Sequence, residues 1–205
     1  MTHALPPGLT DCLLWSDELG MGWHGRAPMS YSGPYFEKYQ QLDASEMGAA
    51  LTRARVELVR KHCAGQVVDI GIGGGRFVLE ADSQGFDVNA EAVAWLQAYG
   101  RFLDPYRQSV EALTCWDSLE HIPEPEKLVA CAQEWLFVSM PIYDSQAHCL
   151  QSKHFKPGEH LWYFTLPGFI GWCERQGFGL VELNHAESEL GREGITSFAF
   201  RRFRG

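Results

Sequence analysis

Residues 67 to 77, VVDIGIGGGRF, constrain the fold more than any other stretch of the chain. An apolar run that contains Asp69 leads directly into glycines at every second position, Gly71, Gly73 and Gly75. The apolar run predicts a buried strand, and the glycines let the backbone turn sharply and let a ligand approach it closely. The pattern therefore predicts a strand, then a ligand-binding turn, then a helix.

Strand and helix patterns alternate after this stretch. We predict five strands, at 66–70, 84–89, 101–104, 110–116 and 134–140, with a helix at 90–100. Such alternation indicates parallel strands with right-handed crossovers and helices on both faces. After a helix capped by Thr165, two more strands at 179–184 and 195–203 are joined only by a loop. We expect an α/β fold with a doubly wound, mostly parallel seven-stranded sheet and an antiparallel C-terminal hairpin.

The chain is divided into an N-terminal arm, 1–44, and one domain, 45–205. A length of 205 residues with 45% hydrophobic content suits a single core. The arm is rich in glycine and proline but also contains Trp15 and Trp23, which are too apolar for a solvated tail. We expect the arm to pack either as a lid over the active site or as a structural strap or dimer contact.

A helix is expected at the start of the domain, from the N-cap Ser45 to a stop at Gly65. Valine and leucine residues recur along one side of this stretch at helical spacing. Two of its basic residues, Arg53 and Arg55, are expected to be in solvent.

Charge and cysteine content limit the partners of the chain. With 17 Lys+Arg against 26 Asp+Glu, the formal charge is -9, which disfavours nucleic acid. Six cysteines without a CxxC pair indicate reduced thiols and a cytoplasmic protein. No apolar run reaches the roughly 18 residues that a membrane span needs, and we expect no targeting signal. Nucleic acid is therefore not an expected partner, and a homodimer is an option.

The glycine turn fits neither of the common phosphate-binding patterns. In the dinucleotide fingerprint the third glycine would fall on Arg76, and the lysine of a P-loop is missing. The stretch instead reads Asp-x-Gly-x-Gly-x-Gly, which offers an acid for a cationic group and bare backbone for a bulky chain. An amino-acid tail attached to a nucleoside has this chemistry.

From 45 to 203 the sequence resembles the class I S-adenosylmethionine-dependent methyltransferases, and most closely the branch that contains the ubiquinone-biosynthesis O-methyltransferases. The likeness depends on the order and spacing of VVDIGIGGG, GFDVNAEAV, LTCWDSLEHIPEP, and FVSMP with EHLWYFTLPGF. It implies a Rossmann-like methyltransferase fold, S-adenosylmethionine as cofactor, S-adenosylhomocysteine as product and a small-molecule acceptor. By this analogy, oxygen is the expected acceptor atom.

The resemblance also assigns cofactor contacts. It implies that the methionine part of the cofactor faces Asp69, Gly71, Gly73 and Gly75. Asp87, at the end of the second strand, would receive both ribose hydroxyls, because a carboxylate can accept two charge-assisted hydrogen bonds. Trp116, just past the fourth strand, would pass beside the cofactor or serve as a core aromatic residue.

The stretch 141–165 is predicted to be a long functional loop. Transfer to a hydroxyl needs a base near the nucleophile, and His154 and His160 are the candidates. The alternative for His160 is a structural role, which is also expected for His121. A metal site was considered for His148, Cys149, His154 and His160. Their spacing matches no recognised zinc pattern, so no metal is predicted.

Two classes of function remain open at the level of sequence. One is an enzyme, a methyltransferase acting on a small molecule. The other is a noncatalytic module that binds S-adenosylmethionine and senses it or activates a partner. The intact glycine turn and Asp87 favour cofactor binding, and the polar, aromatic composition of 141–165 favours catalysis.

Overall fold

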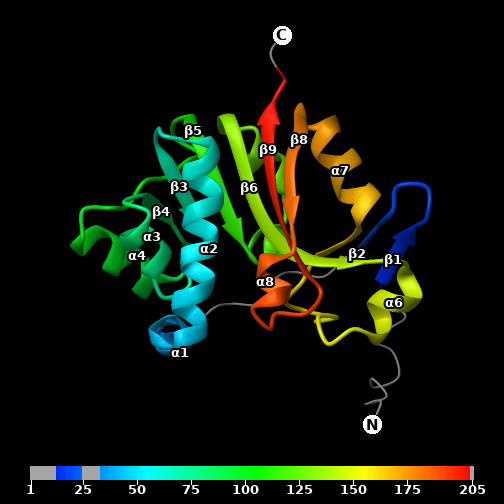
Figure 1. The fold of residues 1–205 in the computed structure, drawn as a ribbon, viewed down its shortest axis with the longest axis horizontal. Coiled ribbons are helices and arrows are strands. Elements are labelled where there is room, and N and C mark those ends of the chain that lie inside the picture. Colours follow the sequence, from blue (N-terminus) through cyan, green and yellow to red (C-terminus); the bar gives the residue numbers. More distant parts are fainter. Residues whose placement is uncertain (1–12, 25–32, 204–205) are drawn as a thin grey trace.

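The computed structural model describes residues 13–24 and 33–203 (Figure 1). Its central feature is a mixed sheet that contains nine strands within these residues. The middle of the sheet is parallel and has the order β4-β3-β5-β6, formed by Gln84–Phe86, Val67–Ile70, Val110–Trp116 and Ala132–Tyr143. At the other side of β6, β9 (Ile195–Arg202) runs antiparallel and pairs with β8 (Phe178–Asn184). The doubly wound sheet and its C-terminal hairpin are confirmed.

The strand predicted at 101–104 forms only one isolated parallel bridge, between Phe102 and Gly85. Two backbone hydrogen bonds support it, from Gly85 N–H to the Arg101 carbonyl and from Leu103 N–H to the Gly85 carbonyl. Pro105 follows closely and has no N–H to donate, so a longer ladder cannot form.

Six of the seven expected strands are present, and three further strands bring the sheet to nine. The hairpin of β1 (Leu13–Ser16) and β2 (Met21–His24) pairs with β7 (Trp162–Thr165), which in turn pairs with the end of β6. Residues 13–24 of the arm therefore contribute an edge of the sheet, in keeping with a structural strap. The rest of the arm before α1, at 1–12 and 25–32, lies outside the described residues. The domain boundary at residue 44 stays a prediction.

Helices pack against the sheet, and their caps explain where they begin. α2 (Glu46–His62) begins after Ser45, whose Oγ accepts the N–H of Gly48 at 3.0 Å. α4 (Ala90–Ala98) and α7 (Leu166–Arg175) begin after Asn89 and Thr165 in the same way. Figure 1 places α1 (Gly33–Ala44), α3 (Arg76–Glu80) and α4 on the β4 side of the sheet.

Two sequence predictions about connections are wrong. The stretch 141–165 is not one long loop, because it contains the end of β6, helix α6 (Gln146–Gln151) and β7. Ser145 caps α6 by accepting the N–H of His148. The connection between β8 and β9 also contains a short helix, α8 (Ala186–Glu189). Both elements are short, and a hydrophobic pattern over so few residues does not reveal a helix.

The core fills both sides of the sheet with aromatic rings. The largest fully buried side chains include Tyr163, Phe137, Phe164, Phe169, Phe178, Phe198 and Phe200. Burying one such side chain contributes roughly 1.5 to 3 kcal/mol. The parallel strands are therefore held firmly, and their carboxyl ends form a rigid edge.

Candidate functional site

The glycine turn lies at the carboxyl end of β3. Gly71, Gly73 and Gly75 all have a positive φ, of 72°, 57° and 88°. L side chains rarely adopt this conformation, and a Cβ on Gly71 would also lie 2.9 Å from Cβ of Ser118. The turn therefore requires glycine for its shape, and it leaves bare backbone at the edge of the sheet.

Asp69 lies beneath this turn and is almost completely buried, with 1% of its surface exposed. Its Oδ1 accepts a hydrogen bond of 2.7 Å from Oγ1 of Thr114, the residue opposite it on β5. Burial raises the pKa of Asp69 to about 7, since nearby cations do not offset the lost hydration. Asp69 thus links two central strands below the predicted cofactor site.

Asp87 directly follows β4, beside the glycine turn. Its Oδ2 accepts the Ile72 N–H at 3.0 Å, and its Oδ1 accepts the Asn89 N–H at 2.8 Å. Burial raises its pKa as well. Each oxygen keeps a further lone pair, so the carboxylate offers two fixed acceptors, which suits a ribose diol.

Helix α1, the last part of the arm, covers the glycine turn; the sequence offered a lid as one alternative for the arm but did not predict this helix. A Cβ on Gly74 would lie 2.6 Å from Cα of Gln40 and from Oδ2 of Asp43, and Asp43 Oδ2 also accepts the N–H of Arg76 at 3.2 Å. Burial raises the pKa of Asp43. Tyr39 lies over Gly73, and the only signal for this contact was the aromatic stretch YFEKY at 35–39.

The side chain of Trp116 packs in the core rather than at the surface of the turn. Its ring meets the ring of Phe77 edge-on at 5.3 Å, and the guanidinium carbon of Arg55 lies 5.3 Å from its centroid. Its indole N–H is buried without a partner among the described residues. These contacts suit the core alternative, and a cofactor contact of Trp116 stays a prediction.

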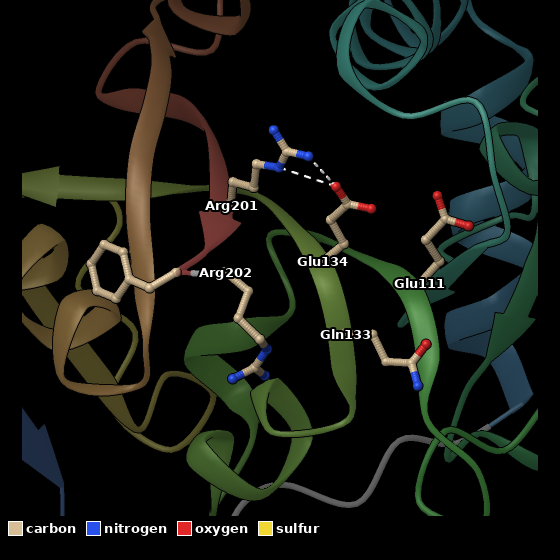
Figure 2. Close-up of a pocket in the computed structure, with 6 residues that line it drawn as sticks. Glu111, Gln133, Glu134, Arg201 and Arg202 are labelled. Atoms are coloured by element: carbon tan, nitrogen blue, oxygen red, sulfur yellow. Dashed lines mark hydrogen bonds and ion pairs between the residues drawn. The ribbon is translucent and has the colours of Figure 1, made fainter. Parts of the chain in front are cut away.

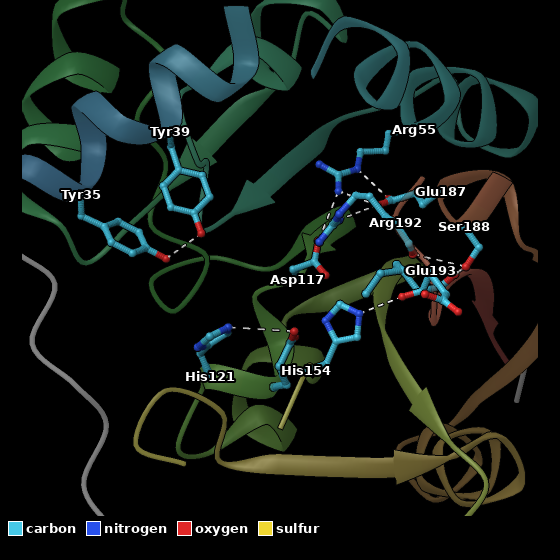
Figure 3. Close-up of polar contacts among 12 residues, drawn as sticks. Tyr35, Tyr39, Arg55, Asp117, His121, His154, Glu187, Ser188, Arg192 and Glu193 are labelled. Atoms are coloured by element: carbon cyan, nitrogen blue, oxygen red, sulfur yellow. Dashed lines mark hydrogen bonds and ion pairs between the residues drawn. The ribbon is translucent and has the colours of Figure 1, made fainter. Parts of the chain in front are cut away.

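A second group of charged residues meets just past β5 (Figure 3). Asp117 has a φ of 51° and accepts hydrogen bonds from Arg192 and, at 3.3 Å, from Arg55. Glu187 receives the same two guanidinium groups, Arg55 Nε at 2.7 Å and Arg192 at 2.6 Å. Burial opposes ionisation of Glu187, but the two cations outweigh it and lower its pKa. We call these four residues the charge cluster.

The charge cluster corrects the expectation that Arg55 is in solvent, whereas Arg53 is exposed as expected. The physical reason is the pair of carboxylates that α8 and the end of β5 bring to α2. These segments lie far apart in the sequence, so a helical pattern alone could not reveal the partners. The one local signal was the presence of Asp117 and Glu187 beside predicted strand ends.

The two candidate bases lie in different surroundings. His154 is half-buried, and its Nε2 is 2.8 Å from the Glu193 carbonyl, so Nε2 donates and Nδ1 is left as an acceptor (Figure 3). Burial lowers the pKa of His154. His160 is buried against His121, with ring centroids 4.7 Å apart, and burial lowers its pKa to about 2. The structure does not bring the two rings together as a pair.

The four residues considered as a metal set do not converge. His148 and Cys149 lie on α6, where His148 contacts Asp144 and Cys149 is buried. Among the described residues, the group whose ligand atoms come within 4.8 Å of one another is instead Glu120, His121 and His160. Of the six cysteines, Cys12 lies outside the described residues, and the other five are free.

A depression on the surface lies away from this site (Figure 2). It has a volume of about 560 Å³ and is lined by Glu111, Gln133, Glu134, Arg201, Arg202 and Phe203. These residues come from the beginnings of β5 and β6 and the end of β9, so the depression is at the amino edge of the parallel strands. Ligands of open α/β sheets bind at the opposite, carboxyl edge. The depression is therefore not part of the candidate site.

The chain belongs to the methyltransferase domain family, whose model matches residues 36–183. Members of this family use S-adenosylmethionine, and the glycine turn with Asp87 suits that cofactor. The enzyme and the cofactor predicted from the sequence are thereby confirmed. No curated protein matches the sequence. Within the described residues, no helix is long and apolar enough to cross a membrane.

Solved structures of methyltransferases share the fold. The magnesium protoporphyrin IX methyltransferase of Synechocystis, with bound S-adenosylhomocysteine, is 14% identical and superposes with a TM-score of 0.56, covering 87% of this chain and 90% of its own. The 1,6-didemethyltoxoflavin N1-methyltransferase of Burkholderia thailandensis is also 14% identical, with a TM-score of 0.55 and coverage of 94% and 99%. At such identities the likeness establishes the fold.

Proposed function

We propose that this methyltransferase acts on a small molecule and transfers the methyl group to an oxygen atom. The observation that carries the proposal is the position of Asp87. Two backbone N–H groups, one from the glycine turn and one from the start of α4, fix its carboxylate at the carboxyl edge of the sheet. Its two oxygens keep acceptor capacity for the two hydroxyls of a diol.

The proposed cofactor contacts follow from the same geometry. Asp87 would hold the ribose, and the backbone of Gly71, Gly73 and Gly75 would lie along the amino-acid tail. Asp69 would lie below the turn, where a cationic ligand would favour its ionised form over the protonated form that burial favours in the free chain. When bound, S-adenosylmethionine supplies a methyl group that its positive sulfonium activates. The chain's own task is then to hold the acceptor in line with that group and to exclude water.

His154 supports a hydroxyl acceptor. A hydroxyl is a weak nucleophile until a base removes its proton, and His154 offers Nδ1 as a neutral base beside the charge cluster. Burial keeps its pKa below the usual range, so the ring is unprotonated at neutral pH. His160 is the weaker of the two candidates, because its low pKa of about 2 leaves little driving force for accepting a proton.

The acceptor class is supported by charge and by resemblance. A formal charge of -9 disfavours polyanionic substrates. The resemblance to the ubiquinone-biosynthesis O-methyltransferases supports oxygen, whereas the Burkholderia neighbour is an N1-methyltransferase and supports nitrogen as the second candidate. A neutral amine already has a free lone pair, so a nitrogen acceptor would need His154 less. Self-association stays a prediction.

The test is to measure release of S-adenosylhomocysteine with two matched panels of small acceptors, phenols and hydroxy acids against primary and ring amines. We expect turnover with the oxygen panel, and we expect Asp87→Ala to lower it by roughly 10- to 150-fold at limiting cofactor. An exposed carboxylate, Asp144, provides the control variant Asp144→Ala, which should keep full turnover. Turnover with amines alone would contradict the oxygen assignment. Cofactor binding without turnover in either panel would contradict a small-molecule acceptor of these classes.

A further inference from the structure

Glu120 is a buried acid whose carboxylate has no hydrogen-bond donor among the described residues. It lies in the short 3-10 helix η2 (Leu119–His121) with 1% of its surface exposed. Both carboxylate oxygens are buried and have no hydrogen-bond partner among the described residues. A buried carboxylate without a partner is strongly destabilising, so the side chain must hold either a proton or a cation.

Two imidazole rings lie next to this carboxylate. Nδ1 of His121 is 2.9 Å from the Glu159 carbonyl and donates its hydrogen there, so Nε2 is the acceptor nitrogen of the neutral ring. Nε2 of His121 is 3.9 Å from Oε1 of Glu120. Metal-ligating histidines characteristically donate their second N–H to a carbonyl or carboxylate in this way. His160 completes the group, and the ligand atoms of all three residues lie within 4.8 Å of one another.

The backbone around these residues is already fixed. Leu161 donates its N–H to the Glu120 carbonyl at 2.8 Å, which ties η2 to the segment that contains His160. The hydroxyl of Tyr163 donates to the His160 carbonyl at 3.2 Å. The three side chains are therefore held together by the fold itself, from two segments about 40 residues apart in the sequence.

We infer that Glu120, His121 and His160 form a binding site for one divalent transition-metal ion of the Zn²⁺ type. Two imidazoles and one carboxylate are a ligand set that such ions accept, with further positions left for water or a ligand. Bonds of about 2.0 to 2.2 Å would place the ligand atoms roughly 3.4 Å apart, so the ion would draw them closer by about 1 Å. The inference concerns this site alone and does not depend on the identity of the methyl acceptor.

The experiment uses the whole chain, freed of metal with a chelator and without S-adenosylmethionine. Zn²⁺ is titrated by calorimetry, and Co²⁺ is added as a visible-absorption probe of nitrogen and oxygen ligation. We expect one Zn²⁺ per chain, a d–d absorption band with Co²⁺ and a higher melting temperature with either ion. Glu120→Gln, an isostere of the protonated acid, should weaken Zn²⁺ binding by about 100-fold or more, beyond the loss expected for an outer-shell change.

His148→Gln is the matched control, because His148 is a half-exposed histidine outside the group and should leave the titration unchanged. Should Glu120→Gln fail to fold, His121→Gln and the Co²⁺ spectrum of the unaltered chain decide the matter. The inference is overturned if no ion binds to the unaltered chain. It is also overturned if binding is equal in the unaltered chain and in Glu120→Gln, which would make Glu120 a buried neutral acid. Neither result would affect the proposed methyl transfer, which is measured separately.

Discussion

Carboxylates at the two halves of the sheet's carboxyl edge have pKa shifts in opposite directions. On the cofactor side, around the glycine turn, burial raises the pKa of Asp43, Asp69 and Asp87. On the acceptor side, past β5, Asp117 and Glu187 share two guanidinium groups, and the pKa of Glu187 is lowered. The cofactor side is acidic without sufficient cations, whereas the charge cluster on the acceptor side pairs two carboxylates with two guanidinium groups.

This difference indicates which side gains electrostatic stabilisation from a bound ligand and which side is stabilised by its own ion pairs. S-adenosylmethionine is a cationic ligand, and an acidic, poorly compensated site gains electrostatic stabilisation when it binds. The charge cluster on the acceptor side has no such deficit, so its ions hold α2, β5 and the connection between β8 and β9 in place whether or not a ligand is bound. The cofactor side thus attracts a cationic ligand by its charge, whereas the acceptor side offers a geometry that its internal ion pairs already fix.

The largest predicted effect is on turnover, and it tests whether the acceptor side contains the base. His154→Gln should lower turnover by about 10²- to 10⁴-fold with a hydroxyl acceptor and leave cofactor affinity nearly unchanged, because the base acts on the acceptor alone. The measurement combines steady-state turnover with calorimetric binding of S-adenosylhomocysteine.

His160→Gln serves as the contrast to this variant. Its ring is buried against His121, so its loss should lower the melting temperature together with activity. If His154→Gln keeps full turnover, the base is another group, such as Glu159 or Tyr163, or proximity alone sustains the reaction.

A somewhat smaller effect is expected in the charge cluster. Glu187→Gln leaves the two cations Arg55 and Arg192 with Asp117 as the one remaining carboxylate of the charge cluster and should lower the free energy of unfolding by about 3 to 5 kcal/mol. Chemical denaturation at neutral pH measures the change. Glu193→Gln is the control, since its carboxylate is exposed, and it should change stability by no more than about 0.5 kcal/mol. Equal stabilities of both variants would mean that the acceptor side is not held by its ions.

On the cofactor side, Asp87→Ala should weaken binding of S-adenosylhomocysteine by roughly 1.5 to 3 kcal/mol, the range for hydrogen bonds to a charged group. Folding should survive, because Ile72 and Asn89 lose only one acceptor each. Calorimetry gives the affinity, and Asp144→Ala is again the exposed control. An unchanged affinity would place the ribose elsewhere.

The same division explains how much the sequence could predict. The glycine turn and Asp87 lie within about 20 residues of one another, and two adjacent parallel strands bring them together, so a contiguous pattern revealed them. Arg55, Asp117, Glu187 and Arg192 come from segments up to 137 positions apart (192 minus 55), and no local pattern pairs them. Asp117 also adopts a φ of 51°, and the sequence alone does not predict this conformation for an aspartate.

The effect that is smallest over a single pH unit concerns Asp69, the most buried acid of the cofactor side. Its pKa is about 7 in the folded chain and 3.8 in the unfolded reference, so the folded state holds a proton that the unfolded state has lost between these values. The stability of the unaltered chain should therefore fall as pH rises through this window, and the contribution should level off above about pH 7.

Asp69→Asn isolates this contribution, because the amide is neutral at every pH and its oxygen can still accept the Thr114 hydroxyl. Relative to the variant, the unaltered chain should lose about 1.4 kcal/mol per pH unit between roughly pH 5 and 6. The measurement is denaturant unfolding of both chains across the window, with Asp144→Asn as the exposed control. If the two stability curves run parallel, Asp69 is ionised throughout, and the cofactor side is compensated in the same way as the acceptor side. A cationic cofactor should reduce the gap between the curves, because it stabilises the ionised carboxylate that the free chain disfavours.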